Sequence, residues 1–224
     1  MGAVLSVWHD CREAALAGKD VRVPSEDELR NACEHCRIED LILDPERGTA
    51  ELADPLMSLD LGAVAKGYAA EMAVRALEQA GFTGYALNLG GNVRTLGTKP
   101  GGESWVAGVQ EPTESGDGAY RLRMGLTDAA LVTSGSYQRY YEADGVRYHH
   151  IISPDTLFPR NDFLSVTIRC GDSGLADALS TAVFNMDLAE GTAFLNALEG
   201  VDACWILADG SLRMTEGMKK FILP

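Results

Sequence analysis

A carboxylate and a hydroxyl stand four residues apart in the segment ADALST, which has the composition of a helix. Asp177 and Thr181 would therefore project from one helix face, about one turn from each other. Both offer hard oxygen atoms, the ligand type that magnesium prefers. An unpaired carboxylate on an inward-facing, apolar helix surface would be strongly unfavourable, so Asp177 needs a partner. Two interpretations are open: a metal site, or a local cap or ion pair at Asp177 with Thr181 bonding back to its own helix.

Lys66 lies in the segment DLGAVAKGY, about one turn into a predicted helix. The first amides of a helix and the positive end of its dipole can hold a phosphate, and a lysine would add positive charge there. No Walker-type loop precedes the segment. The alternative to an anion site is a solvated lysine on an amphipathic helix.

Two segments combine glycine with polar side chains at predicted strand ends. In NLGGN, Asn88 to Asn92, two glycines follow a buried strand, so backbone amides could meet a phosphate or a planar ring without obstruction. In VTSGSY, Thr133, Ser134 and Gly135 offer two hydroxyls and an unobstructed amide in a row. Each segment fits either a ligand site or an ordinary strand turn.

Two adjacent histidines end another predicted strand, just before the proline-bounded loop SPDTLFP. Side chains alternate along a strand, so His149 and His150 must point to opposite faces. One imidazole should face the core or a cleft and the other should face solvent. Histidine is a natural general base near neutral pH, and a purely structural role is the alternative.

Three helices should carry or surround these residues, and a fourth precedes them. Residues 25–37 begin with Ser25 and place Glu28 three positions later, which is the pattern of a capping box. The other predicted helices span Asp60 to Gly81, Gly174 through the segment ADALSTAVFNM, and Glu190 to Leu198.

The predicted strands outnumber the helices, and several are adjacent in sequence. They are LILD, YALNL, WVAGV, YRLRMGL, ALVTS, RYHHII, FLSVTIRC, CWILA and KKFIL. Loops are expected at Gly97–Gly102 and Glu111–Gly118. This arrangement indicates an α+β fold in which helices pack on mixed, largely antiparallel sheets.

The bulk composition narrows the class of protein. A chain of 224 residues fits one domain or two small intertwined lobes. The formal net charge of −14 disfavours nucleic-acid binding, because the affinity of such proteins comes from phosphate contacts. Five cysteines are an odd number without a disulfide framework, so most should be reduced thiols. Neither a signal peptide nor a long apolar segment is visible in the printed sequence.

Five dispersed motifs together resemble the ApbE family of FAD:protein FMN transferases. The chain has DLGAVAKGY, NLGGN, VTSGSY, HHIISPDTLFP and ADALSTAVF where the family has DLGGIAKGY, NLGGD, ATSGDY, HIIDPxTGxP and ADALSTALF. The resemblance implies a single ApbE-like, T-fold-like flavin transferase domain over residues 1–224. Alignment of Val4 to Trp8 with the family's PL-x-x-LW segment implies that the usual N-terminal third is absent.

The resemblance also implies a site and a reaction. Asp177, Thr181 and the carbonyl of Ala63 would hold Mg²⁺ on the pyrophosphate of FAD, and His150 would take the proton from the target threonine. The residues expected to line the flavin nucleotide are Lys66, Asn88, Gly90, Gly91, Thr133, Ser134, Gly135 and His150. The threonine would attack the FMN phosphorus and AMP would leave. The partner would be an acceptor protein with a Ser/Thr-Gly-Ala-Thr-type motif, and a homodimer is compatible with the family.

Four substitutions depart from the family pattern next to these segments. Asn92, Ser136 and Ser153 replace aspartates, and Leu157 replaces a glycine. Two alternative functions therefore stand beside the transferase: an FAD pyrophosphatase that yields FMN and AMP, and a non-catalytic flavin-binding remnant. Family members usually work outside the cytoplasm, often anchored to a membrane.

Overall fold

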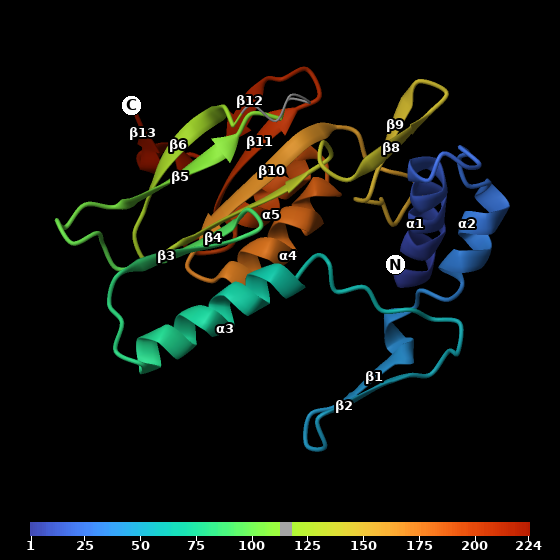
Figure 1. Ribbon diagram of the computed structural model, residues 1–224, viewed down its shortest axis with the longest axis horizontal. Coiled ribbons are helices and arrows are strands. Elements are labelled where there is room, and N and C mark those ends of the chain that lie inside the picture. The colour runs from blue at the N-terminus through green and yellow to red at the C-terminus, as the bar shows by residue number, and fades with distance from the viewer. Residues whose placement is uncertain (113–117) are drawn as a thin grey trace. The chain divides into compact units, whose positions relative to one another are not determined.

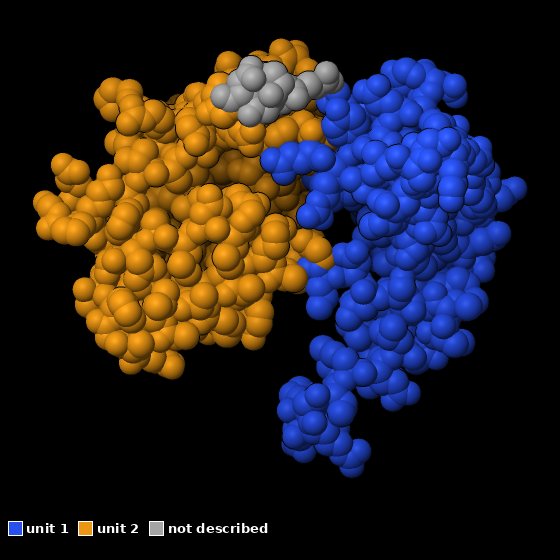
Figure 2. Space-filling view, in the orientation of Figure 1, with its two compact units in different colours: residues 1–61, 138–160 blue, residues 62–137, 161–224 orange. Residues whose placement is uncertain are grey.

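The chain forms two compact units, each built from two separate stretches of sequence (Figure 2). Unit 1 comprises Met1–Leu61 and Gln138–Arg160, and unit 2 comprises Gly62–Tyr137 and Asn161–Pro224. The computed structural model describes residues 1–112 and 118–224. The middle of the loop expected at Glu111–Gly118 therefore lies outside the described residues. No helix among the described residues is long and apolar enough to cross a bilayer.

Unit 1 consists of helices and two separate hairpins (Figure 1). Its helices are α1 (Gly2–Leu16), α2 (Glu26–Cys33) and the 3-10 helix η1 (Ile38–Asp40). Its hairpins pair β1 (Leu41–Asp44) with β2 (Thr49–Leu52) and β8 (Tyr140–Ala143) with β9 (Val146–His149). The core of this unit gathers Val4, Trp8, Leu29, Tyr141 and Ile152.

The capping box predicted for the second helix is present. The Ser25 hydroxyl accepts a hydrogen bond from the amide of Glu28, and the Glu28 carboxylate accepts one from the amide of Ser25. Arg22 donates to both carboxylate oxygens of Glu28, at 2.8 and 2.9 Å. These hydrogen bonds, with that from Arg22 the strongest, lower the pKa of Glu28 to about 2.

Unit 2 contains two antiparallel sheets and the helices that cover one of them (Figure 1). The six-stranded sheet runs in the order β12 (Leu212–Met214), β11 (Asp202–Leu207), β10 (Phe163–Cys170), β7 (Ala130–Gly135), β4 (Asn92–Leu96) and β3 (Tyr85–Leu89). The three-stranded sheet runs β13 (Ile222–Leu223), β6 (Tyr120–Leu126) and β5 (Trp105–Gln110). The helices are α3 (Ala65–Gln79), α4 (Ser173–Phe184), α5 (Leu188–Asn196) and the 3-10 helix η2 (Met218–Phe221).

Apolar packing on both faces of the six-stranded sheet creates a layered unit. Leu131 and Ile206 on one face meet Val109 and Met124 of the three-stranded sheet in a fully buried cluster. Helix α4 packs against β7 and β10 on the other face, and α3 lies alongside α4. The predicted α+β class with antiparallel sheets is therefore confirmed.

Several predicted boundaries are wrong. The helix expected from Asp60 begins only at Ala65, because the preceding residues form a turn. Only the last two residues of KKFIL are a strand, since pairing with β6 begins at Ile222 and the residues before it form η2. The helix expected at Glu190–Leu198 is instead Leu188–Asn196.

Helix α1 and strands β2, β4, β8 and β12 were not predicted. Helix α1 has no side-chain cap, so it lacks the usual start signal. Strand β4 buries Arg94 and Thr95, which hides the apolar alternation of a strand. All five cysteines are free thiols, in line with the prediction.

Candidate functional site

Asp177 is a buried carboxylate near the start of α4, with an exposed fraction of 4%. Its Oδ2 atom accepts a hydrogen bond of 2.8 Å from the backbone amide of Gly67 in the first turn of α3. Its Oδ1 atom lies 3.9 Å from the Nζ atom of Lys66. The negative charge thus lies at the positive end of the α3 dipole, where it is stabilised. Asp177 therefore has partners on another helix, Gly67 and Lys66, in place of the local cap or ion pair that was one of the two interpretations.

Gly67 allows α3 and α4 to approach closely enough for this contact. A Cβ atom at position 67 would lie 2.2 Å from the carbonyl oxygen of Ser173 and 2.5 Å from Cβ of Asp177. Both distances are far inside van der Waals contact, so only glycine fits. Gly67 was not among the predicted site residues, although a glycine inside a helical pattern indicates a packing or functional constraint.

Thr181 lies one turn after Asp177 on α4 and belongs to a hydroxyl cluster with strand β7. The Ser134 hydroxyl lies 2.7 Å from that of Ser180 and 3.1 Å from that of Thr181. Ser180 also donates to the carbonyl of Asp177, at 2.9 Å. The cluster therefore fixes the orientation of the Thr181 hydroxyl relative to the Asp177 carboxylate. Hydrogen bonds of this kind commonly orient metal ligands in proteins.

The polar residues predicted in a row on β7 point to different places. The Thr133 hydroxyl lies 2.8 Å from that of Thr167 on β10, whereas Ser134 faces α4. Alternation along the strand causes this separation. A Cβ atom at Gly135 would meet the Tyr137 ring at 2.5 Å. Of this segment, Ser134 is the residue that the structure brings to Thr181.

Lys66 lies in the first turn of α3, earlier in the helix than predicted, because the helix begins at Ala65. Its side chain is 43% exposed, and Nζ also donates to the carbonyl of Gly62 at 3.4 Å. Ala63 belongs to the turn that leads into this helix. The ammonium group therefore lies between the turn and the Asp177 carboxylate.

Gly90 and Gly91 form the tight turn between β3 and β4, and Asn88 lies near the end of β3. Gly90 and Gly91 have φ values of 61° and 96°, which favour glycine, and Leu89 pairs directly with Asn92. The Asn88 side chain accepts a hydrogen bond of 2.9 Å from the Gly91 amide. These residues make a hairpin turn, one of the two interpretations left open, and a role in ligand binding stays a prediction.

The two histidines lie in unit 1, and their side chains separate as alternation predicts. His149 is buried, with an exposed fraction of 2%, and its Nε2 atom lies 2.9 Å from the carbonyl oxygen of Arg160. His150 is exposed, and its Nδ1 atom lies 3.3 Å from the carbonyl oxygen of Arg139. A carbonyl only accepts, so this contact places the proton of neutral His150 on Nδ1 and leaves the lone pair on Nε2. That tautomer can act as a base.

The chemistry of the donor set fits a hard divalent cation. Asp177 offers a carboxylate whose Oδ1 atom lies 3.9 Å from Nζ of Lys66, which is an ion pair but too long for a hydrogen bond. Thr181 offers a neutral hydroxyl oxygen one turn away. In the described part of the chain, no three His, Cys, Asp or Glu side chains gather into a metal site. A cation here would therefore depend on one carboxylate and on neutral oxygens, as magnesium sites that bind substrate phosphates do.

Ser134→Ala should weaken metal binding without unfolding the protein. The variant removes the hydrogen-bond partner of Thr181, while Ser180 keeps its bond to the Asp177 carbonyl. We expect the dissociation constant for added Mg²⁺ to rise by roughly tenfold. Ser165→Ala, at another buried serine on neighbouring β10, is the control and should leave it unchanged. Equal Mg²⁺ affinity of the two variants would contradict the role of Ser134 in orienting Thr181.

The fold and this cluster define a class of proteins in which one helix, packed on an antiparallel sheet, carries a carboxylate and a hydroxyl one turn apart. The sequence profile of the ApbE family matches residues 1–205. The chain belongs to the ApbE family, which confirms the resemblance noted in its motifs.

Curated relatives and solved structures agree with this assignment. The FAD:protein FMN transferase of Treponema pallidum (strain Nichols) is 35% identical over 97% of this chain and 62% of its own length. That of Klebsiella pneumoniae (strain 342) is 36% identical over 82% of this chain and 56% of its own. The chain thus spans about three fifths of these two relatives.

Two solved structures show the same fold. The ApbE protein of Thermotoga maritima superposes with a TM-score of 0.81 at 32% identity, over 99% of this chain and 75% of that one. The flavin transferase ApbE of Vibrio cholerae gives a TM-score of 0.78 at 26% identity, over 98% and 69%. The ApbE-like fold predicted from the sequence is therefore confirmed.

Proposed function

We propose that this chain transfers the FMN part of FAD to a threonine of an acceptor protein, in a reaction that depends on Mg²⁺ and releases AMP. The buried Asp177 with Thr181 one turn away, in a chain of the ApbE family, is the observation that supports the proposal most directly. The curated relatives from Treponema pallidum and Klebsiella pneumoniae carry the name FAD:protein FMN transferase.

Asp177, Thr181 and the carbonyl of Ala63 would hold the cation, which when bound neutralises pyrophosphate charge and stabilises the leaving group. Lys66 adds a positive charge at the start of α3, where helix amides also favour phosphate. Ser134 orients Thr181 through its hydroxyl. The remaining predicted residues, Asn88, Gly90, Gly91, Thr133 and Gly135, would line the flavin nucleotide.

The proposed reaction is a substitution at the FMN phosphorus. The threonine oxygen forms a new bond to that phosphorus, and the bond from phosphorus to the bridging oxygen of the pyrophosphate breaks. AMP leaves with the bridging oxygen and its electron pair. His150, with its lone pair on Nε2, takes the proton of the threonine hydroxyl.

One assay separates this reaction from the two alternatives. The protein is incubated with FAD, Mg²⁺ and a peptide that carries a Ser/Thr-Gly-Ala-Thr-type motif, or the same peptide with its acceptor threonine replaced by valine. Covalent flavin on the threonine peptide alone would support transfer. Release of FMN and AMP with either peptide would show a pyrophosphatase, and absence of any product would show a non-catalytic protein.

His150→Ala should slow flavin transfer by about a hundredfold, the usual range for loss of a general base, while FAD binding changes little. The imidazole is exposed, so its removal should not disturb the core of unit 1. Single-turnover transfer rates and a titration of FAD fluorescence check the two quantities. Weaker FAD binding with an unchanged transfer rate would show that His150 binds FAD and is not the general base. His9→Ala, at an exposed histidine of α1, is the matched control.

A further inference from the structure

A buried ion pair lies between strand β4 of the six-stranded sheet and helix α3 of the candidate site. Arg94 on β4 donates through Nε to Oε2 of Glu71 on α3, at 2.9 Å. Their exposed fractions are only 6% and 7%. A second guanidinium nitrogen of Arg94 bonds to the carbonyl of Thr95, so the arginine is held at two points.

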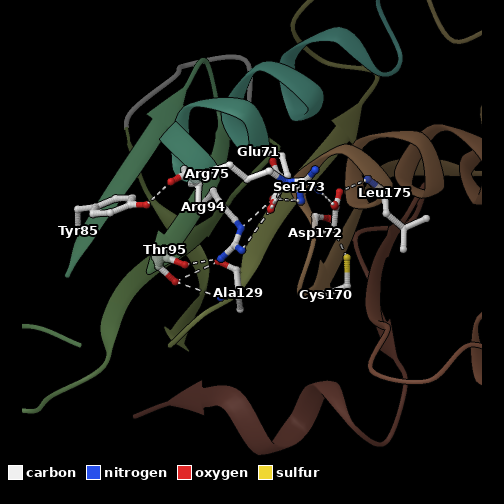
Figure 3. Close-up of polar contacts among 11 residues, drawn as sticks. Glu71, Arg75, Tyr85, Arg94, Thr95, Ala129, Cys170, Asp172, Ser173 and Leu175 are labelled. Carbon is white, nitrogen blue, oxygen red and sulfur yellow. Dashed lines mark hydrogen bonds and ion pairs between the residues drawn. The ribbon is translucent and has the colours of Figure 1, made fainter. Parts of the chain in front are cut away.

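Glu71 also holds the beginning of α4. Its Oε2 atom accepts a hydrogen bond of 2.9 Å from the backbone amide of Ser173, the first residue of that helix. Figure 3 shows the carboxylate of Glu71 between the guanidinium of Arg94 and Ser173. The first amides of a helix have no partner within it, so a carboxylate placed there both satisfies a donor and favours the helix dipole.

Two contacts of equal spacing therefore join α3 to α4. Gly67 and Glu71 lie four residues apart on α3, and Ser173 and Asp177 lie four residues apart on α4. The amide of Gly67 binds the Asp177 carboxylate at 2.8 Å, and the carboxylate of Glu71 binds the Ser173 amide at 2.9 Å. Each contact lies one helical turn from the other, so together they fix both the distance and the rotation of α4 on α3.

We infer that Glu71, held in place by Arg94, is a positioning residue for the metal ligand Asp177. The inference rests on the proposed function, because it requires that Asp177 binds a cation. Glu71 bonds to the amide at the start of α4 and to Arg94, and Asp177 lies one turn further along that helix. Loss of the Ser173 contact lets the start of α4 shift and turns the Asp177 carboxylate away from the geometry that the cation requires.

Two double variants isolate this contact. Replacing Arg94 by Met in both avoids a stranded buried charge, which would be strongly destabilising by itself. Glu71→Gln in the Arg94→Met background keeps a side-chain oxygen that can accept from the Ser173 amide. Glu71→Leu in the same background has a similar size and no acceptor. The two proteins differ in the acceptor for that amide, and glutamine also brings an NH2 group that leucine lacks.

The measurement is binding of Mn²⁺ alone, followed by the loss of the electron paramagnetic resonance signal of the free ion, at a temperature where circular dichroism shows each protein folded. Mn²⁺ binding that wild type shows and Asp177→Asn lacks is assigned to the candidate site. We expect Glu71→Leu with Arg94→Met to bind Mn²⁺ roughly tenfold more weakly than wild type at that site, and Glu71→Gln with Arg94→Met to recover most of the affinity.

Arg75→Gln serves as a control in the wild-type background. Arg75 lies 3.9 Å from Glu71 and 3.4 Å from Asp172, but it is 56% exposed and does not hold the Ser173 amide. The Mn²⁺ affinity of the Arg75→Gln variant should therefore stay near that of wild type. Equal Mn²⁺ affinity in the two double variants would overturn the positioning role and leave the metal site standing. Wild-type binding that does not depend on Asp177 would overturn the metal site and the positioning role together.

Discussion

Asp177→Asn should abolish metal-dependent release of AMP from FAD, with a fall in rate of at least about a hundredfold. The substitution keeps the shape of the side chain, and its amide oxygen can still accept from the Gly67 amide. What is lost is the negative charge that would hold the cation. Steady-state AMP release at several Mg²⁺ concentrations measures the effect.

The same variant should remain as stable as wild type or become more stable. Asp177 is 4% exposed, so folding removes its charge from water, and its nearest cation, Lys66, is 43% exposed and can be solvated when the carboxylate is gone. Thermal unfolding therefore separates a loss of the site from a loss of the fold.

Asp172→Asn provides a matched change from carboxylate to amide on the same helix. Asp172 is the N-cap of α4, and its side chain accepts from the Leu175 amide at 2.9 Å. Asparagine caps helices about as well as aspartate, so activity should stay close to that of wild type. Full activity in Asp177→Asn would show that Asp177 does not hold a cation.

Gly67→Ala should impair both stability and metal binding. The new Cβ atom would lie 2.2 Å from the Ser173 carbonyl oxygen, so α3 and α4 must move apart. Overpacking of this kind destabilises by about 1–3 kcal/mol, which outweighs the gain of about 0.5–1 kcal/mol from replacing a helical glycine by alanine. The shift also displaces the amide that binds Asp177, so Mn²⁺ affinity should fall by roughly tenfold.

Gly191→Ala is the corresponding change in a helix with room for it. Gly191 lies in α5, and the nearest atom to its added Cβ would be Cβ of Val183 at 3.4 Å, an ordinary contact. Chemical denaturation should show a free energy of unfolding that is unchanged or slightly raised. If Gly67→Ala behaved in the same way, close approach of the two helices could not be what requires glycine at position 67.

The sequence predicted the parts of the candidate site that depend on local geometry. Asp177 and Thr181 lie on one turn of one helix, so their relation follows from the helical period alone. The separation of His149 from His150 follows in the same way from strand alternation. Both relations hold in the structure because neither needs a contact with a distant segment.

The partners of these residues could not be predicted from spacing, because they come from distant parts of the chain. The bond from the Gly67 amide to Asp177 spans 110 residues, and that from the Ser173 amide to Glu71 spans 102. Arg94 is charged, so its position in the buried β4 strand makes sense only once Glu71 lies beside it. Single-residue signals such as a glycine within a helix show that a constraint exists, but they do not show what imposes it.

By itself, the sequence determined which residues can supply charge and oxygen ligands, the family to which the chain belongs, and the antiparallel α+β class, because motifs and periodicities are written in neighbouring residues. Only the tertiary structure decided that α3 binds α4 through Gly67 and Glu71 and that Ser134 rather than Thr133 meets Thr181. Such contacts depend on how helices and sheet pack. Packing is set by the shapes and polar groups of surfaces that chain folding brings together, not by the order of residues along any one element.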